Sequence, residues 1–476
     1  MKKEIRTLPL DVLNKYQKPH VSDQIKKELE EEAAAYEGKI IVLDDDPTGT
    51  QSVNHVPVYT DVSQSVFEEI FTNYSKTNFI LTNSRAMTEA ETETLHRNIG
   101  NMLRLSAKGR KFILISRGDS TLRGHFPLET EVLKESLEAD GKEKYDGEII
   151  CPFFRNGGRY TLFHVHYVKD GDRLLPAAET EFAKDKTFGY VSSDLKEYVI
   201  EKSKGRIQEK DIAVIGLDEI QRHDMTGIES KLTAAENFQK LIVDAVSEDD
   251  LTIVSIALYR AIKKGKKFLF RTAADFVKNI SCIRDQPIDF DELASGGDKG
   301  GLVIAGSHTE KTTRQLEQLK EEQNMIFLEM DVNDVDRLDE ESGRLAKLCS
   351  EEIAKGKTPV VYTSRKLVSA NEEGGEAALR CSVKISEAVQ AIAAKLQEKP
   401  AYIIAKGGIT SSDIATKALK IKKAWVMGQI APGVPVWKTG QESRFPEIPY
   451  IVFPGNVGDD GTLREIVHIL SERMGG

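Results

Sequence analysis

GKIIVLDDDPTGT, residues 38–50, gives the clearest indication of the fold class of this chain. The apolar run Ile40 to Leu43 stops abruptly at acids, a proline and a glycine, which is the pattern of a buried strand that ends in a loop. The same pattern recurs at 79–86 and 111–120, with helix-like stretches between and after these runs. Strands spaced by helices predict a mostly parallel sheet with helices on both faces.

The alternation continues to the end of the chain. In the first half, further apolar runs lie at 147–154, 212–220, 252–258 and 267–273. In the second half, they lie at 301–308, 325–330, 358–364, 401–410, 424–431 and 450–456.

A polar, glycine-rich stretch at 287–301 interrupts this series and is the best candidate for a domain boundary. We therefore predict an α/β protein with two domains, 38–290 and 300–476, each a mostly parallel sheet with helices on both faces. Residues 1–37 are rich in Glu, Lys and Ala and predict a helical N-terminal extension outside the main core.

Charge and hydropathy argue against a nucleic-acid-binding protein and against a membrane protein. The net charge of −10 over 476 residues argues against nucleic acid as the main partner, because binding to a phosphate backbone needs a basic surface. No long apolar run indicates a signal peptide or a membrane span, so we expect a cytoplasmic protein without a membrane partner. A homo-oligomer is compatible with this sequence.

Polar loops follow the strands of the first half. In open α/β sheets, ligands bind beyond the carboxyl ends of the strands. Asp44-Asp45-Asp46, Asn83-Ser84-Arg85 and the loop 116–124 all lie at such ends, and Arg159 adds a further cation. Arginine pairs with carboxylates through two parallel hydrogen bonds, so these loops favour a hydroxylated carboxylic acid as ligand. The alternatives are a solvated acidic turn and surface salt bridges.

Glycine loops follow the strands of the second half. They are Gly306 to Thr309, Gly407 to Thr410 and Pro454 to Gly458. Glycine permits close approach of the backbone to a ligand, and a helix N-terminus offers free N–H groups to an anion. The set favours a polyphosphate site, although each loop alone is also a common structural turn. No P-loop is present, because the GKT at 356–358 follows a helix and precedes a strand.

These motifs, in this order, resemble the four-carbon acid sugar kinase family, which includes threonate, erythronate and 3-oxo-tetronate kinases. The resemblance covers the chain from about residue 40 to the end. It rests on DDPTG (45–49), NSR (83–85), DSTLRG (119–124), PFFRNGGRYT (152–161), AGSHT (305–309), KGGITSSDIA (406–415) and PGNVG (454–458).

The resemblance implies an N-terminal acid-sugar domain, a C-terminal ATP domain and an active site between them. It implies ATP and Mg²⁺ as cofactors, while the metal ligands stay unassigned. As substrate residues we predict Asp45, Arg85, Arg117, Gly118, Asp119, Ser120 and Arg159. As ATP residues we predict Ser307, Gly407, Gly408, Ile409, Thr410 and Gly455.

Asp45 and Asp119 are the candidate catalytic carboxylates, and Arg85 or Arg117 is expected to hold the carboxylate of the acid. Two departures from the family lie beside this site. Arg117 stands where the family usually has lysine, and His125 stands where it usually has asparagine. Both bear on which acid is bound. The predicted reaction is ATP-dependent phosphorylation of a hydroxyl of a small, four-carbon sugar acid.

Two other functions fit parts of the sequence. Asp44, Asp46 and Thr48 match the DxDxT motif of haloacid-dehalogenase-type phosphatases, in which the first acid is the nucleophile and the acids bind Mg²⁺. Asp459-Asp460 would then supply the late acidic pair. A non-catalytic sensor of acid sugars is the third candidate, and it needs no ATP site.

Overall fold

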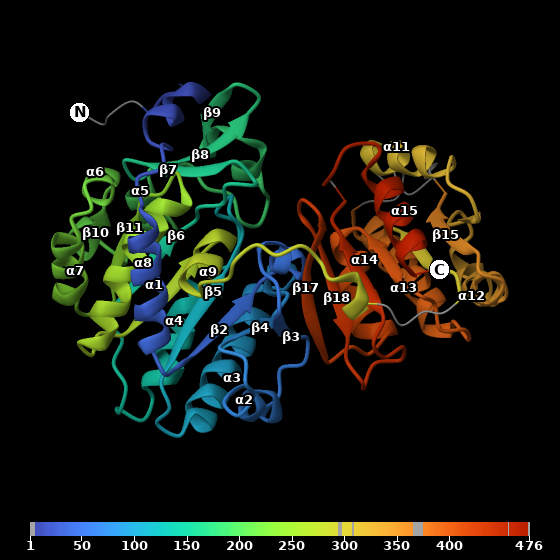
Figure 1. Cartoon of the computed structure of the whole chain (residues 1–476), viewed down its shortest axis with the longest axis horizontal. Helices are drawn as coiled ribbons and strands as arrows, with labels where there is room; N and C mark the ends of the chain where they lie inside the picture. The colour runs from blue at the N-terminus through green and yellow to red at the C-terminus, as the bar shows by residue number, and fades with distance from the viewer. Residues whose placement is uncertain (1–4, 294–297, 307–308, 365–374, 456, 475–476) are drawn as a thin grey trace. The chain divides into compact units, whose positions relative to one another are not determined.

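The computed structural model shows an α/β protein, which confirms the predicted fold class (Figure 1). The residues that it describes are 5–293, 298–306, 309–364, 375–455 and 457–474. The chain divides into two compact units. The first comprises Met1–Gly49 and Asp61–Arg284, and the second comprises Thr50–Thr60 and Asp285–Gly476.

A parallel sheet forms the centre of the first unit. Its strands lie side by side in the order β10 (Ile212–Ile215), β11 (Gln239–Val243), β6 (Gly147–Cys151), β12 (Phe268–Thr272), β5 (Phe112–Arg117), β2 (Lys39–Asp44) and β4 (Thr77–Leu81). Ile40 to Leu43 in β2 are at most 2% exposed, as expected for a strand covered on both faces.

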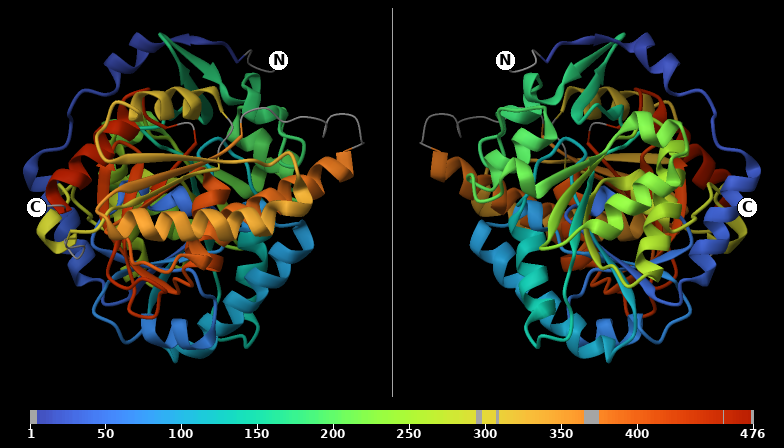
Figure 2. Two further views of the ribbon diagram at one scale, coloured as in Figure 1. Left: turned by 90° about the vertical axis from the view of Figure 1, so that its right-hand side faces the viewer. Right: turned by 90° about the vertical axis from the view of Figure 1, so that its left-hand side faces the viewer.

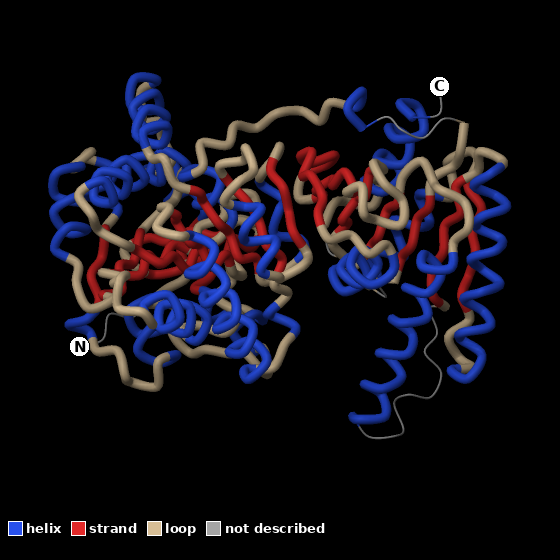
Figure 3. Tube along the Cα trace, turned by 90° about the horizontal axis from the view of Figure 1, so that it is seen from below, coloured by secondary structure: helices blue, strands red, loops and turns tan. Residues whose placement is uncertain are grey.

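Helices cover both faces of this sheet, above and below the strands in the left half of Figure 3. They are α1 (Asp23–Ala35), α2 (Gln64–Ile70), α3 (Glu89–Ala107), α4 (Leu128–Glu138), α5 (Leu195–Lys202), α6 (Leu217–Gln221), α7 (Met225–Ala234), α8 (Glu248–Lys263) and α9 (Ala274–Ile280). A small antiparallel sheet lies beside them, in the order β1 (Leu8–Pro9), β9 (Arg173–Pro176), β8 (Val165–Asp170) and β7 (Arg159–Leu162).

The second unit contains a mixed sheet. Its order is β3 (Val56–Tyr59), β17 (Lys423–Ala431), β18 (Val434–Thr439), β19 (Pro449–Phe453), β16 (Ile403–Lys406), β13 (Leu302–Ala305), β15 (Thr358–Thr363) and β14 (Met325–Met330). The strands from β19 to β14 are parallel, whereas β3, β17, β18 and β19 pair antiparallel.

The helices of the second unit are α10 (Phe290–Leu293), α11 (Glu310–Leu319), α12 (Leu338–Ala354), α13 (Gly375–Lys395), α14 (Gly408–Asp413) and α15 (Thr462–Met474). In the left view of Figure 2, α12 and α13 (orange) lie together against the strands of this unit. In the described residues, no helix combines the length and the apolar character needed to cross a bilayer.

One predicted strand is wrong. Residues 252–258 lie inside α8, where almost every side chain is buried. A short apolar run is compatible with a buried strand and with a buried helix, and only its neighbours in space decide between them. The strand that precedes α8, β11, was not predicted, because it begins with the polar residues Gln239 and Lys240 and its apolar run is only Leu241 to Val243.

The chain leaves the first unit immediately after its acidic turn. Residues 50–60 belong to the second unit, where β3 pairs with β17. The Nε1–H of the buried Trp437 donates a hydrogen bond of 2.9 Å to the Thr50 hydroxyl. The hydrophobic pattern does not reveal this excursion, because a short strand such as 56–59 fits either sheet.

The N-terminal extension packs against α8 of the first unit. It contains a 3₁₀ helix (Leu10–Lys15) and α1. Arg260 of α8 pairs with Glu28 and Glu32 of α1. Nε2 of His20 lies 3.0 Å from Oδ1 of the buried Asp250. These ion pairs fix the extension to the first unit.

Candidate active-site residues in each unit

Four neighbouring strands of the first unit end at one edge of the sheet. The register places Asp44 of β2 opposite both Leu81 of β4 and Arg117 of β5, and Arg117 opposite Thr272 of β12. Because parallel strands present their carboxyl ends on the same side, the loops that follow them come together. The structure therefore brings the predicted acids 44–46, Arg85 and the 117–120 loop to one place.

Arginines already pair with all three acids of the turn. Nη2 of Arg85 lies 2.6 Å from Oδ1 of Asp45, and its Nε donates to Oδ2 at 3.2 Å. Nη1 of the same arginine lies 3.3 Å from Asp46. Nη1 of Arg117 lies 3.2 Å from Oδ1 of Asp44. Asp45 is thus held in a two-pronged pair, which fixes its orientation.

Asp44 is packed against the backbone of its own turn. It is 1% exposed, and burial raises the pKa of its carboxyl group to about 7, although Arg117 partly offsets this rise. A Cβ on Gly49 would lie 1.8 Å from Oδ2 of Asp44, so the backbone of Gly49 packs directly on the carboxylate. A nucleophilic aspartate needs an open carboxylate, so this packing argues against the phosphatase mechanism.

Arginines interact with the acidic residue of the loop that follows β5. Oδ2 of Asp119 accepts a hydrogen bond of 2.7 Å from Nε of Arg123. Burial alone would raise the pKa of Asp119, but Arg85 and Arg123 outweigh it and hold the pKa well below the usual range. The carbonyl of Ser120 accepts a hydrogen bond of 2.7 Å from Nε2 of His166. Asp119 is therefore a fixed negative charge and a weak base.

Arg271 and Glu129 belong to the same cluster and were not among the predicted residues. Arg271, from β12, pairs with the buried Glu129 and donates a 3.0 Å hydrogen bond to the Ser116 hydroxyl. A Cβ on Gly118 would lie 2.4 Å from the guanidinium carbon of Arg271, which explains the need for glycine there. The sequence could have indicated Arg271 as a site residue, because it lies near the end of the predicted strand 267–273.

Arg159 differs from the other arginines of this region. No carboxylate lies within ion-pair distance of its guanidinium in the part of the chain that the structure describes, and its buried Nε has no hydrogen-bond partner there. Burial lowers the pKa of Arg159, and the charge of Asp119 partly opposes this shift. Its guanidinium lies 5.6 Å from the centre of the Phe182 ring. Arg159 therefore retains capacity to bind an anion.

The glycine loops of the second unit also meet at one edge. The adjacent strands β13, β16 and β19 end level with one another, at Ala305, Lys406 and Phe453. The N–H of Gly407 donates a 2.9 Å hydrogen bond to the carbonyl of Phe453. The hydroxyl of Thr309, which caps α11, lies 3.4 Å from the Gly455 carbonyl. Of the predicted ATP residues, Ser307 lies outside the described residues.

The two glycines at the start of α14 have different roles. Gly407 has a φ of 123°, a conformation that favours glycine, whereas a Cβ on Gly408 would meet no neighbouring atom of the described residues within 4 Å. The side chain of Ile409 is 71% exposed. Thr410 packs on Gly306, where a Cβ would lie 2.2 Å from its Oγ1. The turn requires Gly407, whereas no packing contact with the residues that the structure describes requires glycine at 408.

Lys406 is a further residue that the predicted set omitted. Its side chain is fully buried, and its Nζ lies 3.8 Å from the centre of the Phe453 ring and 3.3 Å from the Pro454 carbonyl. Burial lowers its pKa to about 7, and the charge of Lys311 acts in the same direction. Such a lysine, next to the glycine turn, gains a full charge when an anion binds nearby.

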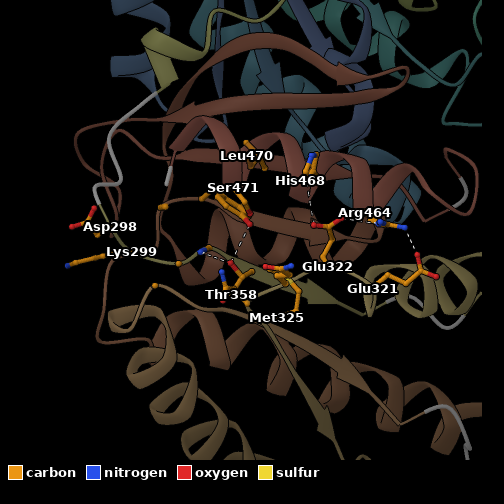
Figure 4. Close-up of a pocket in the computed structure, with 17 residues that line it drawn as sticks. Asp298, Lys299, Glu321, Glu322, Met325, Thr358, Arg464, His468, Leu470 and Ser471 are labelled. Atoms are coloured by element: carbon orange, nitrogen blue, oxygen red, sulfur yellow. Dashed lines mark hydrogen bonds and ion pairs between the residues drawn. The ribbon is translucent and has the colours of Figure 1, made fainter. Parts of the chain in front are cut away.

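A polar cavity of about 550 Å³ in the second unit lies at the other edge of the sheet. Figure 4 shows its lining, which includes Met325 and Thr358 at the amino ends of β14 and β15. Its arginine, Arg464, already pairs with Glu321 and Glu322. Because ligands of such sheets bind at the carboxyl ends, we do not assign the nucleotide to this cavity.

A metal site built by protein side chains is not evident. Within the described residues, no group of three or more His, Cys, Asp or Glu side chains is placed to hold a metal ion. The carboxylates of Asp44, Asp45 and Asp46 pair with arginines. These residues do not fit a protein-held Mg²⁺.

Two family models match most of the chain. One, described as a sugar-binding N-terminal domain, matches residues 40–280. The other, described as a nucleotide-binding C-terminal domain, matches residues 302–463. A comparison with proteins of curated function gave no significant match.

Solved structures share the fold. Haemophilus influenzae protein HI1011, which carries the DUF1537 family model, has 18% identity and a TM-score of 0.62, and the match covers 90% of this chain and 99% of that one. A Salmonella typhimurium LT2 protein, described provisionally as a tRNA synthase, has 18% identity and a TM-score of 0.65, with 91% and 99% covered. At this identity the likeness shows the fold alone.

Proposed function

Since the chain belongs to the four-carbon acid sugar kinase family, we propose that it transfers the terminal phosphate of ATP to a hydroxyl of a small sugar acid with four carbons. One observation carries the proposal. The cluster of arginines and aspartates lies at the carboxyl edge of the sheet in the first unit, which matches the sugar-binding family model. The glycine loops lie at the carboxyl edge of the sheet in the second unit, which matches the nucleotide-binding family model.

Phosphoryl transfer depends mainly on positioning and on neutralising charge. The substrate hydroxyl attacks the γ-phosphorus, the bond from that phosphorus to the ADP oxygen breaks, and the hydroxyl proton must be accepted. We assign Asp45 to orient the hydroxyl and accept the proton, because Arg85 fixes its carboxylate. Asp119, which is a weak base here, holds Arg123 and Arg85 in place as a positioning residue.

Arg159 is our assignment for the carboxylate of the acid. Arg85 and Arg117 were the expected partners, but both already pair with aspartates. Backbone N–H groups at Gly408 to Thr410, together with Gly455 and Ser307, are assigned to the ATP phosphates. Mg²⁺ enters the proposal only as an ion carried by those phosphates, where it would neutralise charge.

The proposal is tested by an ADP-release screen over the stereoisomers of four-carbon sugar acids and related acids. A kinase releases ADP only when its acid is present. Hydrolysis of phosphate esters without ATP would instead identify a phosphatase. Tight binding of an acid, with no ADP release and no ATP binding, would identify a sensor. Either of these two results refutes the kinase assignment.

Exchanging Arg159 for leucine should raise KM for the acid about 10- to 100-fold, since hydrogen bonds to a charged group contribute about 1.5–3 kcal/mol. The matched variant is Arg117→Leu, which breaks the buried pair with Asp44 and should cost about 3–5 kcal/mol of stability. Steady-state kinetics and thermal melts separate the two. An unchanged KM in Arg159→Leu would remove Arg159 from the acid site.

The Arg117→Leu defect should also depend on pH. In the intact protein the pKa of Asp44 is already raised to about 7, and losing Arg117 raises it further. A carboxyl group with a raised pKa destabilises the folded protein at those pH values at which the group is ionised in the unfolded chain but still protonated in the folded protein. The variant should therefore lose additional stability between pH 6 and 8, whereas the Asp44 contribution in the intact protein levels off above pH 7.

Lys406 should make ATP affinity depend on pH. Its pKa is about 7 in the free protein, and phosphates bound nearby should raise that pKa. Binding then takes up a proton above pH 7, so Kd should rise by up to about tenfold per pH unit between pH 7 and 9. Calorimetry at several pH values measures this. Lys406→Met should bind more weakly and show no such slope, and a slope equal to that of the intact protein would contradict the assignment.

A further inference from the structure

The first unit contains a second pocket, far from its acidic turn. It lies at the amino ends of β5 and β12, and its volume of about 290 Å³ is near the lower end of the range for ligand pockets, which is about 300–1,000 Å³. Aromatic rings form part of its wall, from Tyr36, Phe112, Tyr145 and Phe268. Basic residues also line it, namely Arg110, Lys111, Lys263, Lys266 and Lys267.

The charge of this pocket is not balanced. Lys266 pairs with Asp146 at 3.0 Å, and Lys267 pairs with Glu143. For Lys111 and Lys263, no carboxylate lies within ion-pair distance among the residues that the structure describes. In a chain with a net charge of −10, such a local excess of positive charge favours an anionic ligand. The polar cavity of the second unit differs, since its Arg464 is paired.

Two tyrosine hydroxyls in the pocket lack hydrogen-bond partners. Tyr145 is 6% exposed, and in the described part of the chain neither its hydroxyl nor that of Tyr36 has a partner. Burial raises the pKa of both phenols, so both keep their protons and remain donors. Neither hydroxyl is among the buried polar atoms without a partner, so both reach the open space of the pocket, where they can donate to an acceptor group of a ligand.

Tyr36 comes from the N-terminal extension. It precedes residue 40, where the match to the sugar-binding model begins. Nζ of Lys76 donates to the carbonyls of Ala33 and Tyr36, the latter at 2.7 Å, and fixes the end of the extension. The ring of Tyr36 lies 5.9 Å from that of Tyr259. The extension thus builds one wall of the pocket in a fixed position.

We propose that this pocket binds a small organic anion with a flat apolar body, at a site distinct from the sugar-acid site. The apolar body would contact the aromatic wall, the anionic group would pair with Lys111 and Lys263, and an acceptor would meet the tyrosine hydroxyls. β5 begins at the pocket with Phe112 and ends at the sugar-acid cluster with Arg117. The five residue steps from Phe112 to Arg117 separate the two sites by about 17 Å.

A pair of dyes tests the proposal, with saturating ATP present. 8-Anilino-1-naphthalenesulfonate is a flat anion, and N-phenyl-1-naphthylamine is its neutral counterpart. The pocket variant is Lys111→Glu with Lys263→Glu. The control is Lys210→Glu with Lys347→Glu, which reverses two exposed charges elsewhere. Fluorescence titrations give Kd, and melting curves verify that each variant is folded.

The anionic dye should saturate at one site, and its Kd should rise at least about tenfold in the pocket variant and less than about twofold in the control. The neutral dye should change less than about twofold in both. Tyr145→Phe, which removes only a hydroxyl, should weaken the anionic dye about three- to tenfold. Equal weakening in the pocket variant and the control, or no saturable binding below about 1 mM, overturns the proposal.

Discussion

Asp45→Asn should lower kcat by about 10²- to 10⁴-fold, the usual contribution of a positioned proton acceptor. The amide keeps the size of the carboxylate and can still accept a hydrogen bond from Arg85, but it cannot take the proton from the attacking hydroxyl. KM for ATP should change little, because Asp45 belongs to the first unit and the loops that we assign to the nucleotide belong to the second.

Asp46→Asn is the matched control for this variant. Asp46 pairs with the same arginine, Arg85, and lies in the same turn. If the effect of Asp45→Asn came only from disturbing Arg85, both variants should lose similar activity. We expect Asp46→Asn to lose less than about tenfold in kcat. A kcat for Asp45→Asn within tenfold of the intact enzyme, in a folded protein, would show that another group accepts the proton.

Gly408→Val should abolish measurable ATP binding, with Kd raised at least about 100-fold, or about 2.7 kcal/mol. A Cβ at this position meets no neighbouring atom within 4 Å in the described part of the chain, so the valine methyl groups would fill space that we assign to ATP phosphates or ribose. The melting temperature and the affinity for the sugar acid should stay close to those of the intact protein. Calorimetry with each ligand and a melting curve measure the three quantities.

Gly407→Val is the control that distinguishes an effect on the space for the ligand from an effect of backbone strain. Gly407 has a φ of 123°, which L-residues rarely adopt, so this neighbouring variant should lose stability. Its ATP binding should fall in proportion to the folded fraction or further. If Gly408→Val melts normally and binds ATP normally, then the 407–410 loop does not contact the nucleotide.

The sequence predicted the fold class well because that signal is local and repeated. Each apolar run that ends in acids, arginines or glycines specifies a buried strand and the side on which its loop lies. The order of motifs from Asp45 to Gly458 also predicted the family, which the two matched domains confirm. The strand predicted at 252–258 was wrong, because a segment that is buried on all sides has the same apolar pattern in a strand and in a helix such as α8.

The predicted site residues were chosen by type and position, and the sequence could not rank them. In the sequence, Arg85, Arg117 and Arg159 are the same residue type and cannot be distinguished by their capacity to bind an anion. Arg117 pairs with Asp44, which is 73 residues away in the chain, whereas Arg159 keeps its bonding capacity. Which arginine is available depends on which carboxylate lies within reach, and only the packed structure sets that distance.

The chemistry at the strand ends of this protein could be predicted from the amino-acid sequence, because parallel strands bring their carboxyl ends together whatever their order in the sheet. Packing in three dimensions was needed to find the burial of Lys406, the passage of residues 50–60 into the second unit and the wall that Tyr36 contributes to the basic pocket. A pKa, an ion pair or a cavity depends on neighbours in space, and residues remote in the chain supply most of those neighbours.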